Sequence, residues 1–91
     1  MDHKKYVLLC DNTLFVFGNG QNLADINDWR HALCVWNEGL ESFYFDSKGD
    51  DIEHVDNLLR RMLTGPVNLY TEEAVRNGGK SVRLELKQVV E

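Results

Sequence analysis

The sequence lacks the features of secreted and membrane proteins. No apolar stretch approaches the roughly 18–20 residues that a membrane-spanning helix needs. The apolar run from Tyr6 to Cys10 is short and has no small-residue cleavage site after it, so we expect no signal peptide and a cytoplasmic protein. Only two cysteines are present, Cys10 and Cys34, and we expect both to remain thiols packed as small hydrophobic residues. With 91 residues, the chain should form one domain over 1–91.

Motifs for catalysis and metal binding are also lacking. The histidines His3, His31 and His54 are far apart, and no Cys-x-x-Cys or His-x-x-x-His spacing occurs. Segments 18–23 and 46–51 depart from the dinucleotide-binding and calcium-loop patterns at required positions. We therefore expect no enzymatic activity, no catalytic residue, no metal and no cofactor.

Basic residues are the other scarce group. The chain has 10 Lys and Arg against 15 Asp and Glu, for a formal charge of −5. The imbalance is concentrated in the segment 22–56, which holds nine acids and two bases, a balance of −7. Such a segment repels nucleic acid and acidic membranes and attracts basic surfaces, so we expect no direct nucleic-acid binding and no membrane contact.

Turn signals and hydrophobic patterns predict an α+β fold: an antiparallel sheet built from three hairpins, with one main helix over 50–64 packed on one face. The segment 22–30 is ambiguous between a loop and a short helix, and Glu72 to Arg76 either continues a strand or forms one helical turn. The predicted hairpins are 5–10 with 13–17 around Asp11-Asn12, 31–36 with 40–46 around Asn37-Glu38-Gly39, and 67–71 with 81–89, whose turn signal is Asn77-Gly78-Gly79.

The helix over 50–64 has the clearest local signals. Asp50 can cap its first turn, and Glu53 completes a capping-box pattern. Gly65 and Pro66 end it. Its apolar residues form one stripe: Ile52, Val55, Leu58, Leu59, Met62 and Leu63.

The second predicted hairpin is apolar on both faces. Its large residues Trp36 and Tyr44 would each expose roughly 150–250 Å² if left uncovered. Either the segment from Leu23 to Trp29 or a second copy of the chain should cover them, and we expect a homodimer.

Two functions compete as explanations of the acidic segment beyond simple solubility. In the first, the acids imitate DNA phosphates and occupy the basic groove of a nucleic-acid-handling protein, as small acidic anti-restriction inhibitors of phages and mobile elements do. Helical residues three apart advance about 4.5 Å, close to the phosphate spacing of about 3.4 Å along the axis of one DNA strand. The predicted partner-binding residues are Asp25, Asp28, Glu38, Glu41, Asp50, Asp51, Glu53 and Asp56.

In the second, the chain is a small homodimeric interaction or assembly module without nucleic-acid mimicry. It would bind its partner through an aromatic face that contains Trp36, Tyr44 and Phe45. A third hypothesis, an enzyme whose site assembles only across a dimer, has no motif in its favour.

Overall fold

The computed structural model describes residues 4–39, 43–44, 51–71, 74, 76–79 and 81–90. The helices are α1 (Ile26–Gly39) and α2 (Asp51–Thr64). The strands are β1 (Lys5–Cys10), β2 (Thr13–Leu14), β3 (Leu23–Ala24), β4 (Phe43–Tyr44), β5 (Val67–Thr71) and β6 (Ser81–Val89).

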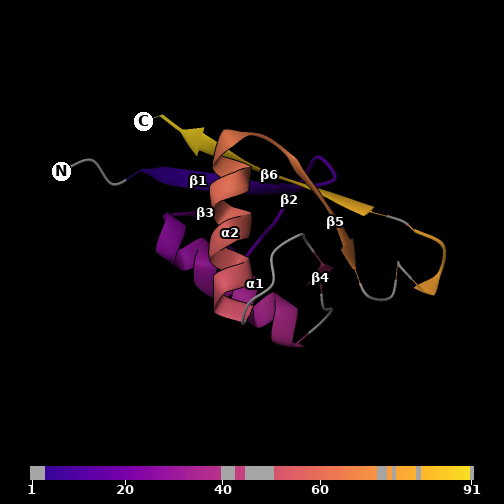
Figure 1. Ribbon diagram of the computed structural model, residues 1–91. Coiled ribbons are helices and arrows are strands. Elements are labelled where there is room, and N and C mark those ends of the chain that lie inside the picture. Colours follow the sequence, from indigo (N-terminus) through magenta and orange to yellow (C-terminus); the bar gives the residue numbers. More distant parts are fainter. Residues whose placement is uncertain are drawn as a thin grey trace.

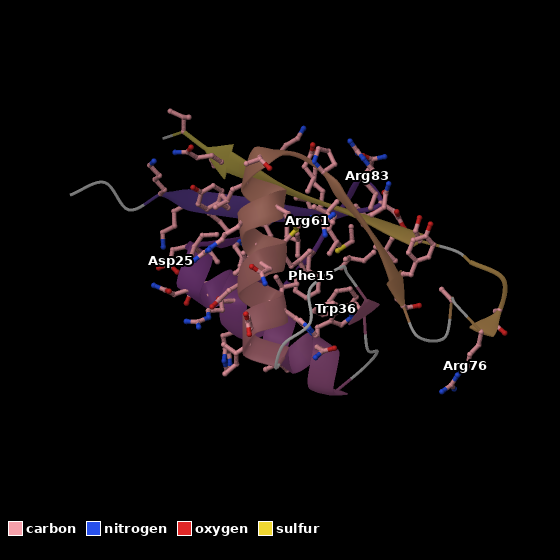
Figure 2. All side chains as sticks on the ribbon, in the orientation of Figure 1. Phe15, Asp25, Trp36, Arg61, Arg76 and Arg83 are labelled. Carbon is pink, nitrogen blue, oxygen red and sulfur yellow. The ribbon has the colours of Figure 1, made fainter. Side chains whose placement is uncertain are left out.

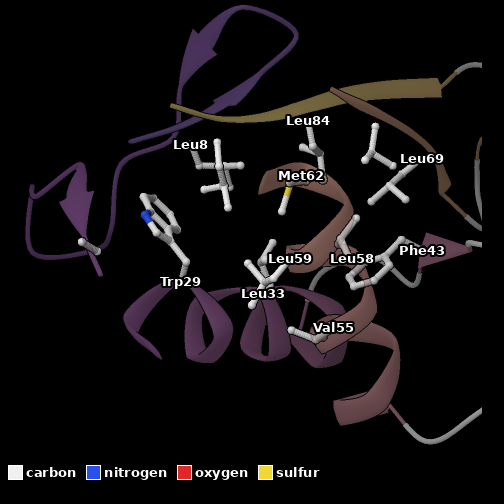
Figure 3. Packing of buried hydrophobic residues seen from close by; sticks show 13 residues of the cluster. Leu8, Trp29, Leu33, Phe43, Val55, Leu58, Leu59, Met62, Leu69 and Leu84 are labelled. Carbon is white, nitrogen blue, oxygen red and sulfur yellow. The ribbon is translucent and has the colours of Figure 1, made fainter. Parts of the chain in front are cut away.

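The strands form one antiparallel sheet in the order β2-β1-β6-β5-β4, and β3 pairs with the other half of β1. Both helices lie on one face of this sheet (Figures 1 and 3). The predicted α+β class is therefore confirmed, with two helices on the covered face instead of one main helix.

Two of the predicted hairpins are confirmed. Asp11 and Asn12 connect β1 to β2 with φ of 51° and 66°, the left-handed backbone that a two-residue hairpin turn requires. The strand predicted over 13–17 is shorter, because β2 ends at Leu14. β5 pairs with β6, and Gly78 and Gly79 adopt φ of 100° and 96° in the connection between them.

Ala74 and Arg76 are helical in the same connection, and backbone N–H groups of Asn77 and Gly79 donate to the Ala74 carbonyl. This favours the helical turn over a continued strand. Glu72, Glu73 and Val75 lie outside the described residues.

The second predicted hairpin is wrong. His31–Trp36 lies inside α1, and the described part of its predicted partner strand, β4, pairs with β5. The segment alternates as a strand would, but Trp29, Leu33 and Trp36 also recur at helical spacing, and a short apolar run does not distinguish the two. Burial of Trp29 at 0% and Leu33 at 1% exposure favours the helix.

The ambiguous segment 22–30 divides between two elements. Leu23 and Ala24 form β3 beside β1, and Ile26 begins α1. Asp25 lies between them and caps the helix: its carboxylate accepts a hydrogen bond from the Asp28 N–H at 2.9 Å.

The helix predicted over 50–64 is confirmed as α2, although Asp50 and its proposed capping interaction lie outside the described residues. Ile52 and Leu63, at the ends of the predicted apolar stripe, are 57% and 47% exposed. The middle of the stripe enters the core between the helices and the sheet (Figure 3): Val55, Leu58, Leu59 and Met62.

Strand β6 follows the predicted alternation. Leu84 and Leu86 are buried and Val82 packs against the core, while Arg83 and Lys87 are exposed on the other face. Glu85 lies on that outer face, with a carboxylate oxygen 3.9 Å from Arg83 Nη2 and another 3.9 Å from Lys87 Nζ. The outer face is therefore partly polar, as the solvated face of an antiparallel sheet usually is.

The change from hairpin to helix weakens one of the two reasons for expecting a second copy of the chain, the exposure of Trp36; the other, Tyr44, has its side chain outside the described residues. Trp36 is half-buried and stacks on Phe43, with ring centroids 5.5 Å apart and planes at 29°. Its apolar surface is thus covered in part within the chain. The homodimer itself stays a prediction.

Candidate functional site

The predicted acidic site can be examined at half of its eight residues. Glu41 and Asp50 lie outside the described residues, as do the side chains of Glu38 and Asp51. The other four lie on the helical layer: Asp25, Asp28, Glu53 and Asp56.

Asp25 has a structural role at the start of α1. The hydrogen bond from the Asp28 N–H is the largest cause of a lowered pKa at Asp25, and the positive charge of Lys5 adds to the effect. A carboxylate at this end of a helix also meets the partial positive charge of the helix dipole. The negative charge of Asp25 therefore interacts in part with groups of the chain itself.

Asp56 is bound to an arginine of the other helix. Arg30 Nε lies 2.8 Å from Asp56 Oδ1, and Arg30 Nη2 lies 3.1 Å from Asp56 Oδ2. This two-point pairing joins α1 to α2 and neutralises one member of the proposed phosphate-like row. Of the four described members of the predicted site, Asp28 and Glu53 are the two that are exposed.

The predicted aromatic face is represented by Trp36. The side chain of Tyr44 and the whole of Phe45 lie outside what the structure describes. Trp36 lines an apolar groove of about 450 Å³ between α1 and the connection from β2 to β3. The groove is lined by Phe15, Val16, Phe17, Gly18, His31, Ala32, Val35 and Trp36.

The two walls of the apolar groove come from segments far apart in the chain. Phe15 and Trp36, both labelled in Figure 2, belong to opposite walls. Helix α1 contributes His31, Ala32, Val35 and Trp36. Val35 and Trp36 follow His31 and Ala32 by four positions, and residues four apart lie on the same side of a helix. His31 is the one ionisable residue among the eight that line the groove.

An aromatic cluster of Phe15, Phe17 and Trp29 holds the β2–β3 connection against α1. Phe17 stacks on Trp29 with centroids 4.4 Å apart and planes at 28°, and Phe15 meets Trp29 edge-on at 5.6 Å. Trp29 is completely buried, and its indole N–H donates to the Tyr6 carbonyl at 2.9 Å. The indole therefore links β1, the connection and α1.

Backbone hydrogen bonds fix the same connection. The Phe15 N–H donates to the Leu8 carbonyl at 2.8 Å, and the Phe17 N–H donates to the Gln21 carbonyl at 2.7 Å. Gly20 closes the turn with φ of 85°, which favours glycine. The wall is thus held in place before any partner binds, as ligand sites usually are.

The rim of the apolar groove exposes aliphatic side chains on both walls. Val16 on the connection and Val35 on α1 are each 52% exposed, and Leu14, just before the connection, is 47% exposed. Exposed apolar side chains gathered around a concave surface are typical of protein–protein contact sites.

Sequence reasoning missed the apolar groove because it assigned both walls to strands. The segment 13–17 was expected to continue the first hairpin, and 31–36 to begin the second. The helical spacing of Trp29, Leu33 and Trp36 was the signal that could have revealed one wall.

The described residues offer little for covalent or metal chemistry. No group of three or more His, Cys, Asp or Glu side chains among them could hold a metal ion. Burial, and then the negative charge of Asp11, raise the pKa of the Cys10 thiol to about 11, so very little of it is the nucleophilic thiolate at neutral pH. Neither described helix is long and apolar enough to cross a membrane.

Comparison with known proteins adds no assignment. No family model, curated protein or solved structure matches the chain significantly.

Proposed function

We propose that this chain is a non-enzymatic protein-binding module whose apolar groove receives hydrophobic side chains of a partner. The observation that carries the proposal is the concave apolar surface with exposed Val16 and Val35 on opposite walls. Its volume of about 450 Å³ suits a few anchoring side chains. A reducing cytoplasmic location, in which Cys10 and Cys34 remain thiols, is part of the proposal.

Serine substitutions at the rim test this function. Val16→Ser and Val35→Ser change half-exposed side chains, so the fold should tolerate them, while affinity for the partner should fall. Ile52→Ser is the matched control, because Ile52 is 57% exposed on α2 and does not line the groove. Partners captured from the native cell extract by the wild type and Ile52→Ser should be lost with Val35→Ser. Equal capture by all three would remove the groove from consideration.

An acidic inhibitor that occupies a basic groove of a nucleic-acid-handling protein is the second candidate. The balance of −7 over 22–56 and the exposure of Asp28 and Glu53 favour it. The Arg30–Asp56 pair weakens it, since a paired carboxylate is a poor substitute for a phosphate. A complex of this kind should weaken steeply with salt and be displaced by duplex DNA, whereas an apolar groove complex should resist both.

The predicted homodimer is a separate question. Sedimentation of the chain at micromolar concentration distinguishes one monomeric species from a dimer. Val35→Ser in the same experiment would show whether any dimer forms through the apolar groove.

A further inference from the structure

We propose that the occupant of the apolar groove is an amphipathic helix of a partner protein, with apolar side chains in the groove and a lysine or arginine beside Asp28. This inference rests on the proposed protein-binding function and identifies the chemistry of the partner.

The apolar groove has a distinct direction along α1. Its helical wall runs from His31 to Trp36, and Asp28 precedes His31 by three residues (Figure 2 labels Trp36 on this helix and Asp25 just before it). Residues three apart are neighbours on a helix surface. The exposed carboxylate of Asp28 therefore lies beyond one end of the apolar lining.

The charge at that end is negative. None of the eight lining residues is Asp, Glu, Lys or Arg. Any formal charge next to the groove therefore comes from residues around it rather than from its lining. Asp25 and Asp28 together exceed the partial charge of about +0.5 at a helix N-terminus, although Lys5 offsets part of the charge of Asp25. The guanidinium of Arg30 is bound to Asp56 on α2.

A cationic flank complements this arrangement, and an anionic one is repelled by it. A second copy of the chain is a poorer occupant, because it carries a formal charge of −5 of its own. A partner helix suits the helical wall, since ridges of side chains on one helix pack into the grooves of another.

The structure sets the spacing that the partner needs. Val35 follows Asp28 by seven residues in α1, which corresponds to about 10 Å along the helix axis. The cationic side chain of the partner should therefore lie about two helical turns from its apolar anchors.

Three synthetic helical peptides test the inference on the full chain. They share leucine and phenylalanine anchors and differ only in a lysine, glutamine or glutamate flank two turns away. Isothermal titration calorimetry on the wild type and on each variant reports binding. At about 50 mM salt we expect the lysine peptide to bind at least about fivefold more tightly than the glutamate peptide.

Asp28→Asn should reduce affinity for the lysine peptide roughly two- to fivefold and leave the glutamine peptide unchanged. Glu53→Gln is the matched control, since Glu53 is also an exposed acid but belongs to α2. Val35→Ser should weaken binding of all three peptides, and circular dichroism verifies that each variant is folded.

The possible failures are distinguishable. Equal binding of the three peptides, or an Asp28→Asn variant that behaves as wild type, would overturn the charged-partner inference and leave the protein-binding function standing. Unchanged binding by Val35→Ser would overturn both. Absence of peptide binding at millimolar concentration, with self-association that Val35→Ser abolishes, would assign the apolar groove to a second copy of this chain.

Discussion

Replacing Trp29 by phenylalanine tests how the wall of the apolar groove is held in place. Trp29 is 0% exposed, stacks on Phe17 and donates its indole N–H to the Tyr6 carbonyl at 2.9 Å. Phenylalanine keeps an aromatic ring at this position, but it removes the donor and the second ring of the indole.

The expected loss of unfolding free energy has two parts. A typical intramolecular hydrogen bond contributes about 0.5–1.5 kcal/mol net. The smaller ring buries on the order of 50 Å² less apolar surface, and at about 25 cal/mol per Å² this adds roughly 1.3 kcal/mol. Trp29→Phe should therefore cost about 2–3 kcal/mol, less than the roughly 5–15 kcal/mol that holds a small domain folded.

Urea unfolding followed by far-ultraviolet circular dichroism measures this loss. Trp36→Phe is the control, because Trp36 is half-buried at the groove surface and should lose less stability. If Trp29→Phe cost under about 1 kcal/mol, or no more than the control, the proposed anchoring role of Trp29 would be refuted.

Three further predictions concern the surroundings of the apolar groove. Because the pKa of Asp25 is lowered in the folded state, its ionised carboxylate stabilises the fold above pH about 4, and this stabilisation is lost as pH falls through the lower folded value. Asp25→Asn keeps a capping oxygen but cannot titrate, so it should remove this loss from unfolding free energies measured against pH. A double-mutant cycle on Arg30 and Asp56 should give a coupling of about 0.5–1 kcal/mol that shrinks in high salt, since the two side chains are 43% and 40% exposed; no coupling at low salt would contradict the pairing. Iodoacetamide should alkylate Cys10 at pH 8 roughly 200-fold more slowly than a free cysteine, with the rate rising about tenfold per pH unit; mass spectrometry follows the reaction, and rapid labelling at pH 8 would show that the thiol is not shielded.

The elements with strong local signals could be predicted from the sequence. Asp11 and Asn12 tolerate a left-handed backbone, and that property places the first turn. Val55, Leu58 and Met62 recur with a helical period and form the buried stripe of α2. Each of these signals depends on neighbours along the chain, so no tertiary information was needed.

Helix α1 could not be assigned in the same way. The run from His31 to Trp36 is apolar on every side and only six residues long, so alternation and helical periodicity describe it equally well. Whether this run is a strand or a helix depends on Trp29, which contacts Tyr6 and Phe17, two residues distant from it in the sequence. The apolar groove depends on this decision, because α1 forms one of its walls.

The sequence by itself determined the α+β class, the β1–β2 and β5–β6 hairpins, helix α2 and the acidic balance of 22–56, because turn chemistry, side-chain period and charge are local or additive properties. Only the tertiary structure decided that Asp56 is paired with Arg30 and that Phe15 and Trp36 line the same apolar groove. These features join residues up to 26 positions apart, and such contacts depend on how the helices pack against the sheet.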